Sequence, residues 1–83
     1  MAKILITEFI NNESLSKLRK VFNVHYEENL WKNQKKIIKT IKDFDCLIVR
    51  NKTNVNKNLL SAATKIKLVG RLGIGLDNID TKY

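Results

Sequence analysis

LIVRNKT (residues 47–53) and LVGRLGIGLDNID (residues 68–80) are the two stretches that decide the fold. In each of them a short apolar run suited to a buried strand ends at an arginine, Arg50 in the first and Arg71 in the second. Lysine supplies thirteen of the sixteen basic residues of the chain, and arginine only three. Two of those three arginines therefore follow expected strands directly, which predicts a role that lysine would fill less well.

The rest of the chain alternates between the apolar spacing of strands and that of helices. The expected strands are 3–7, 21–26, 45–49 and 66–70, and the expected helices are 11–22, 33–44 and 54–65. Because a single helix joins each strand to the next, the strands are expected to run parallel, with right-handed crossovers. The chain is thus expected to be an α/β protein, a flavodoxin-like three-layer parallel sheet with the order β-α-β-α-β-α-β.

Asparagine and serine side chains mark the expected helix starts, because they can accept hydrogen bonds from the first free backbone N–H groups. Asn12 or Ser14 is expected to cap the first helix, and Asn54 or Asn56 the third. The sequence leaves both choices open.

Both arginines are expected at the edge of the sheet where ligands bind. In an open parallel sheet this is the edge at the carboxyl ends of the strands, and neighbouring strands lie about 4.8 Å apart. If the strands that end at Arg50 and Arg71 are neighbours, their guanidinium groups can reach one anion. The planar fork of guanidinium pairs two oxygens of a carboxylate or phosphate at once, which an ammonium group cannot do.

Two glycines follow Arg71, at positions 73 and 75. They permit a tight turn in which the N–H groups around Ile74 and Gly75 could hold a carboxylate. They could equally serve only as a turn before a helix capped by Asp77 or Asp80. They do not match the dinucleotide fingerprint G-x-G-x-x-G, because the third glycine position is Asn78.

Composition excludes several classes of protein. The 83 residues suffice for one domain, and the sequence has no signal peptide and no apolar stretch of about 20 residues that could span a membrane, so a cytoplasmic location is expected. Cys46 and His25 are expected to be structural, and no metal-ligand spacing is present. A receiver domain would need acids after the first strand and an Asp at the end of the third, where this chain has Thr7-Glu8 and Arg50.

The net charge of +8 supports an alternative, a small basic module that binds nucleic acid or another polyanion. Against it, the lysines are spread over every polar segment. Aromatic residues make up only 7% of the chain, and Trp31, Tyr26 and Phe44 do not interleave with basic residues in the sequence. Nucleic acid is therefore not the expected partner.

The residues from Leu47 to Asp80 resemble the D-isomer-specific 2-hydroxyacid dehydrogenase family, and the residues from Lys3 to Phe44 do so more loosely. The likeness rests on a combination of features: Arg50 after a strand, Thr53, Val55, the pair Gly70-Arg71 and the motif GxGxDNID. The resemblance implies that residues 1–83 are part of a substrate-binding domain with a flavodoxin-like sheet, cut before its fifth strand.

The resemblance also implies a site for a small anionic 2-hydroxy or 2-oxo acid. The arginine matching Arg50 reaches the far end of the substrate, the one matching Arg71 lies in the same cleft, and amides matching Ile74 and Gly75 hold the substrate carboxylate. Asn51 and Leu72 stand where the family often has small residues, which predicts a narrower pocket. The expected substrate-binding residues are Arg50, Asn51, Arg71, Gly73, Ile74 and Gly75.

The resemblance places the chemistry elsewhere. In the family, an Arg, a Glu and a His for catalysis and the NAD site belong to a downstream Rossmann domain, which this chain lacks. No catalytic residue, cofactor site or metal site is therefore expected here, and NAD belongs to the parent enzyme. The parent is expected to be a homodimer, and the 83 residues alone are expected to be inactive.

Overall fold

The computed structural model describes residues 2–71, which form four parallel strands and the helices between them. Their order along the chain is β1 (Lys3–Ile6), α1 (Asn12–Val21), β2 (Asn23–Tyr26), the 3₁₀ turn Leu30–Lys32, α2 (Gln34–Thr40), the 3₁₀ turn Ile41–Asp43, β3 (Cys46–Val49), α3 (Lys57–Ala62) and β4 (Leu68–Arg71). The predicted alternation of strands and helices is confirmed. Residues 72–83, which include the predicted site residues Gly73, Ile74 and Gly75, lie outside the described residues.

The strands form one sheet in the order β2-β1-β3-β4. All three strand pairs are parallel, and β3 and β4 are neighbours in which Val49 lies opposite Arg71. This is the predicted flavodoxin-like order, and its topological switch point lies between β1 and β3. The strands that carry Arg50 and Arg71 are therefore adjacent, as the prediction required.

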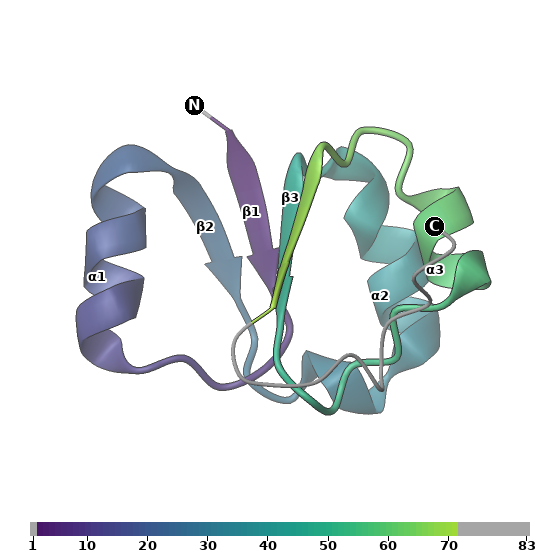
Figure 1. The fold of residues 1–83 in the computed structure, drawn as a ribbon, viewed down its shortest axis with the longest axis horizontal. Coiled ribbons are helices and arrows are strands. Elements are labelled where there is room, and N and C mark those ends of the chain that lie inside the picture. The colour runs from purple at the N-terminus through teal and green to yellow at the C-terminus, as the bar shows by residue number, and fades with distance from the viewer. Residues whose placement is uncertain (1, 72–83) are drawn as a thin grey trace.

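Helices cover both faces of the sheet, which makes the fold three-layered (Figure 1). On one face α1 packs over Ile4, Ile6 and Ile48, and on the other α2 and α3 pack over Leu5 and Leu47. The buried strand residues alternate between these two clusters because successive side chains of a strand point to opposite faces. The ends of β1 and β3 are thereby held rigidly at one edge, at the bottom of Figure 1.

The helix starts differ partly from the prediction. The cap of α1 is Asn11, whose Oδ1 accepts a hydrogen bond from the N–H of Ser14 at 2.8 Å, so the predicted caps Asn12 and Ser14 are wrong. Asn11 fits because its backbone is extended, whereas Asn12 is already the first helical residue. For α3 the structure selects Asn56, whose Oδ1 accepts from the N–H of Leu59 at 3.0 Å.

The Asn56 cap gives a stability prediction. Replacing Asn56 by alanine leaves the N–H of Leu59 without its acceptor, and we expect a loss of about 1 kcal/mol in the free energy of unfolding. Asn54→Ala is the matched control, because the cap does not use that exposed side chain, and its effect should stay within about 0.5 kcal/mol. Urea unfolding measures both variants. Equal losses would show that the cap does not stabilise α3.

The remaining expectations concern single residues. Cys46 is half-buried on the α1 face of the sheet, and burial, followed by the neighbouring Asp45, raises the pKa of its thiol. His25 lies on β2, exposed, with its Nε2 2.9 Å from Glu27 Oε1. None of the helices among the described residues is long and apolar enough to cross a membrane.

Candidate functional site at the carboxyl edge of the sheet

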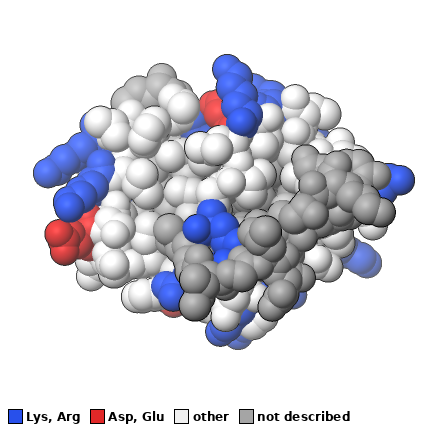
Figure 2. Space-filling view, viewed as in Figure 1, with Lys and Arg blue, Asp and Glu red and all other residues white. Residues whose placement is uncertain are grey.

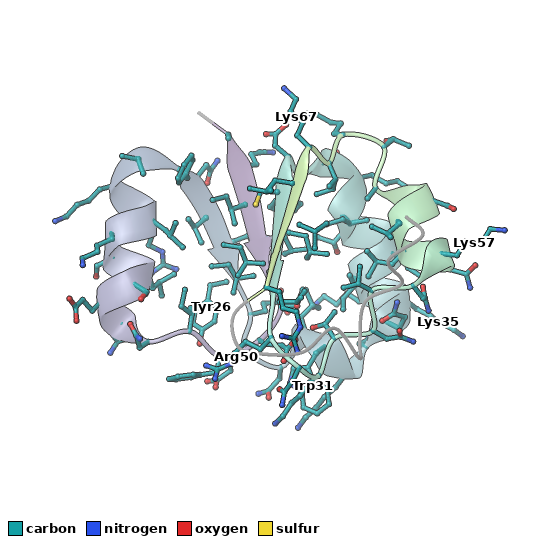
Figure 3. The ribbon with its side chains drawn as sticks, in the orientation of Figure 1. Tyr26, Trp31, Lys35, Arg50, Lys57 and Lys67 are labelled. Atoms are coloured by element: carbon teal, nitrogen blue, oxygen red, sulfur yellow. The ribbon has the colours of Figure 1, made fainter. Side chains whose placement is uncertain are left out.

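A depression of about 340 Å³ lies at the carboxyl edge, beside the switch point between β1 and β3. Three loops line it, one after each of β1, β2 and β3. Its lining residues include Glu8 and Phe9 from the first loop, Trp31 from the second, and Arg50, Asn51 and Lys52 from the third. The volume falls within the range of small-molecule sites. Arg50 and Trp31 are both labelled at this edge in Figure 3.

We call residues 50–53 the RNKT loop, and a buried carboxylate determines its shape. Glu8 is only 2% exposed, and its two oxygens accept hydrogen bonds from three backbone N–H groups of the loop. The donors are Arg50 at 2.8 Å, Lys52 at 2.9 Å and Thr53 at 2.8 Å. Successive N–H groups that converge in this way form an anion nest, and here the anion is part of the protein itself.

The ionisation of Glu8 follows from these contacts. Burial by itself raises the pKa of the carboxyl group, but the hydroxyl of Thr53 and the N–H groups of Arg50, Thr53 and Lys52 donate hydrogen bonds to it. Together they outweigh burial and hold the pKa of Glu8 below its ordinary value of 4.5. Glu8 is therefore a carboxylate at neutral pH, and it accepts hydrogen bonds without donating any.

The basic side chains of the loop lie against aromatic rings. The guanidinium carbon of Arg50 is 6.0 Å from the centre of the Phe9 ring, and Nη1 makes a long contact of 3.5 Å with the carbonyl oxygen of Phe9. The ammonium group of Lys52 lies 4.9 Å from the centre of the Trp31 ring, and that of Lys32 lies 5.5 Å from it. Trp31 therefore contacts one lysine that follows it directly in the sequence, Lys32, and one that comes from a different loop, Lys52.

Arg50 and Arg71 share the edge but leave it in different directions. Arg71 lies opposite Val49, so its side chain leaves the sheet on the same face as that of Val49, toward α2 and α3. Arg50 follows Val49 and extends toward Phe9, beyond β1. The structure thus brings Arg50 and Asn51 into the depression, and Arg71 does not line it.

Sequence reasoning missed Glu8, Trp31 and Lys52. Glu8 had a usable signal, since an acid that comes two residues after β1 must lie at the carboxyl edge. Trp31 had none, because its position depends on the path of the loop between β2 and α2. Among the described residues, no three His, Cys, Asp or Glu side chains gather in a way that could hold a metal ion.

The model of the D-isomer specific 2-hydroxyacid dehydrogenase catalytic domain matches residues 4–83. The chain belongs to this family. It is 37% identical over 82 residues to the D-3-phosphoglycerate dehydrogenase of Methanocaldococcus jannaschii, a match that covers 99% of this chain and 15% of the relative. The (S)-sulfolactate dehydrogenase of Chromohalobacter salexigens is 35% identical over 80 residues, covering 96% of the chain and 26% of that protein. The resemblance found in the sequence is confirmed.

Solved structures have the same fold as this chain. A crystal structure of a Pyrococcus horikoshii OT3 protein superposes with a TM-score of 0.91 at 26% identity, covering 99% of this chain and 24% of that one. A phosphoglycerate oxidoreductase from Vibrio cholerae superposes with a TM-score of 0.81 at 22% identity, covering 99% and 28%, and it shows the fold alone. This dehydrogenase-family chain spans only 15% and 26% of the two curated relatives above.

Proposed function

We propose that this dehydrogenase-family chain is the substrate-binding part of an NAD-dependent D-2-hydroxyacid dehydrogenase and binds a small 2-hydroxy or 2-oxo acid at the carboxyl edge. The observation that carries the proposal is the position of Arg50 and Asn51, which line a depression at the switch point of a sheet of this family. The relatives are named for phosphoglycerate, sulfolactate and glyoxylate, each of which is a small acid.

The chemistry of the edge suits such a ligand. Arg50 would pair the anionic group at the far end of the substrate, and Arg71 would approach the same ligand from β4. The N–H groups of Ile74 and Gly75 would hold the carboxylate, and Gly73 belongs to the same proposed site. The N–H groups of Arg50, Lys52 and Thr53 are already bonded to Glu8, so at the RNKT loop a ligand would meet the side chains of Arg50, Asn51 and Lys52.

NAD would supply the hydride acceptor for oxidation of the 2-hydroxy acid. The sequence of this chain does not fit that cofactor, because its glycines miss the G-x-G-x-x-G spacing at position 78. We therefore assign NAD, and the residues that move the proton and the hydride, to another part of the whole enzyme. A cytoplasmic location and a homodimeric whole enzyme belong to the same proposal.

The test is a comparison of the chain with a chimera. In the chimera, this chain replaces the aligned segment of the Methanocaldococcus jannaschii relative, with which it shares 37% identity. We expect no NAD-linked turnover of D-3-phosphoglycerate or hydroxypyruvate by the 83 residues alone, and turnover of at least one of them by the chimera. Turnover by the chain alone, or a folded chimera that binds NAD without turning over either acid, would contradict the proposal.

A second candidate, polyanion binding, is supported by the contacts of Lys32 and Lys52 with Trp31. Together with Phe9, which lies beside Arg50, this makes two rings at the edge, too few for a run of stacking positions. On the face shown in Figure 2 the Lys and Arg side chains lie in small separate groups and form no continuous patch. A single-stranded oligonucleotide distinguishes the candidates. Tight binding that falls steeply with added salt would favour the second.

A further inference from the structure

Among the described residues that line the depression, Glu8 is the acid whose side chain accepts hydrogen bonds from the backbone of the RNKT loop. Its carboxylate lies behind the loop, buried, while the side chains of Arg50 and Lys52 are exposed in front of it. The three N–H groups that turn inward to Glu8 fix the peptide planes of the loop. The directions in which Arg50 and Lys52 leave the backbone follow from those planes.

The hydroxyl groups of two buried threonines complete the arrangement. The hydroxyl group of Thr53 donates a hydrogen bond to the carboxylate of Glu8, and the Oγ1 of Thr53 lies 2.7 Å from the Oγ1 of Thr7. Thr7 is therefore the donor in that pair, and its own proton points to Thr53. This chain of hydrogen bonds joins the end of β1 to the end of β3, and within the described residues no buried side-chain oxygen or nitrogen lacks a partner.

We propose that Glu8 is a positioning residue for anion binding: its carboxylate holds the RNKT loop in the shape that presents Arg50, Asn51 and Lys52 to the ligand. The inference rests on the proposed function, because the ligand is taken to be the small acid bound at this edge. Glu8 itself would not touch the ligand, since its two oxygens are occupied by the loop.

The charge of Glu8 and its hydrogen bonds to the loop predict opposite effects of a substitution on anion binding. A carboxylate repels an anionic ligand, so removal of its charge should tighten binding if Glu8 acts only through the field. If Glu8 acts through the loop, Glu8→Gln should weaken binding. The amide of glutamine replaces one acceptor oxygen by an NH₂ group, which cannot accept the N–H bonds that the carboxylate accepts.

The experiment uses the full 83-residue chain, labelled with ¹⁵N and titrated with D-3-phosphoglycerate and, separately, with inorganic phosphate. The variants are Glu8→Gln, Glu8→Asp and Glu28→Gln. Glu28 is exposed and lines the same depression, and among residues 2–71 no hydrogen bond or ion pair joins its side chain to the loop. Glu13→Gln, on the exposed side of α1, is the remote control. Amide hydrogen exchange at Arg50, Lys52 and Thr53 is measured in each chain.

Glu8→Gln is expected to weaken binding of D-3-phosphoglycerate at least tenfold and to speed exchange of the three loop amides at least tenfold. Glu28→Gln should bind the anion as tightly as the wild type or more tightly, and Glu13→Gln should stay within twofold. Glu8→Asp keeps the charge but is one methylene shorter, so it should fall between the wild type and Glu8→Gln. It decides the matter if Glu8→Gln does not fold.

Unchanged or tighter binding by folded Glu8→Gln would overturn the proposal, and so would unchanged exchange at the loop amides. Failure of the wild-type chain to bind either anion would count against the proposed function instead. In that case the exchange rates still decide whether Glu8 holds the loop, because they need no ligand.

Discussion

Replacing Glu8 by alanine is expected to lower the free energy of unfolding by about 3 kcal/mol or more. The change leaves three loop N–H groups and the hydroxyl of Thr53 without their acceptor. Each buried donor left unsatisfied costs about 1–3 kcal/mol. The bond from the N–H of Thr53 is buried and those from Arg50 and Lys52 are partly buried, so water offsets part of the sum. A domain of 83 residues has a small free energy of unfolding. A loss of about 3 kcal/mol should therefore leave a large fraction of the variant unfolded at about 37 °C.

Urea unfolding followed by fluorescence measures the loss directly, because the chain has a single tryptophan, Trp31, which lines the same depression. Glu28→Ala is the control, since it removes an exposed acid from that depression, and its effect should stay within about 0.5 kcal/mol. A loss below about 1 kcal/mol for Glu8→Ala would show that the loop N–H groups find other acceptors.

The same carboxylate predicts how stability depends on pH. The pKa of Glu8 lies below its ordinary value of 4.5, so on acidification the unfolded state takes up the proton first. The contribution of Glu8 is therefore complete above about pH 4.5 and is lost as the pH falls through the folded-state pKa. Glu27 and Asp45, whose pKa values are also lowered, act in the same direction. In Glu8→Gln the free energy of unfolding should therefore fall less steeply on acidification than in the wild type. Urea unfolding at a series of pH values measures this difference.

Arg50→Ala in the chimeric enzyme is expected to raise KM for a phosphorylated or dicarboxylic substrate by about 100-fold, with little change in the affinity for NAD. The estimate takes two charge-assisted hydrogen bonds at about 1.5 kcal/mol each. Arg50→Lys keeps the charge but loses the fork, so its KM should lie between those of wild type and Arg50→Ala. The backbone N–H of Arg50 still bonds to Glu8 in both variants, so the loop is retained.

The matched control is Arg19→Ala, which removes the third arginine of the chain from the last turn of α1. Its KM should equal that of the wild-type chimera. Arg71→Ala should raise KM in the same direction as Arg50→Ala. A KM unchanged by Arg50→Ala would show that this side chain does not bind the substrate. Equal increases in KM for Arg19→Ala and Arg50→Ala would show that both act only through the general charge of the surface.

The fold was predictable because its signals are local and repeated. The buried residues of β1 and β3 and the helical spacing of Ile37, Ile41 and Phe44 are readable one element at a time. The predicted second helix was too long, since α2 ends at Thr40 and a 3₁₀ turn carries the chain to Phe44. Position along a parallel strand also sufficed to place Arg50 and Arg71 at one edge.

What the sequence could not supply is the direction of side chains once the strands have ended. Lys52 contacts Trp31, which is 21 residues earlier in the sequence, and it donates its N–H to Glu8, which is 44 residues earlier. Both contacts depend on how the loops turn. The pleat, in contrast, is regular, and with the register known it assigns Arg71 to the face of Val49. The expected amide site at Ile74 and Gly75 stays a prediction.

The most direct test of the account is the side-chain spectrum of the arginines in the 83-residue chain during titration with D-3-phosphoglycerate. The chain has only three arginines, so three Nε–H signals are expected. The account predicts that the signals of Arg50 and Arg71 shift along one saturating curve while that of Arg19 stays in place. Shifts of Arg50 and Arg71 with different affinities, or a shift of Arg19 as large as theirs, would contradict the claim that two forked cations at one edge of the sheet bind one small acid.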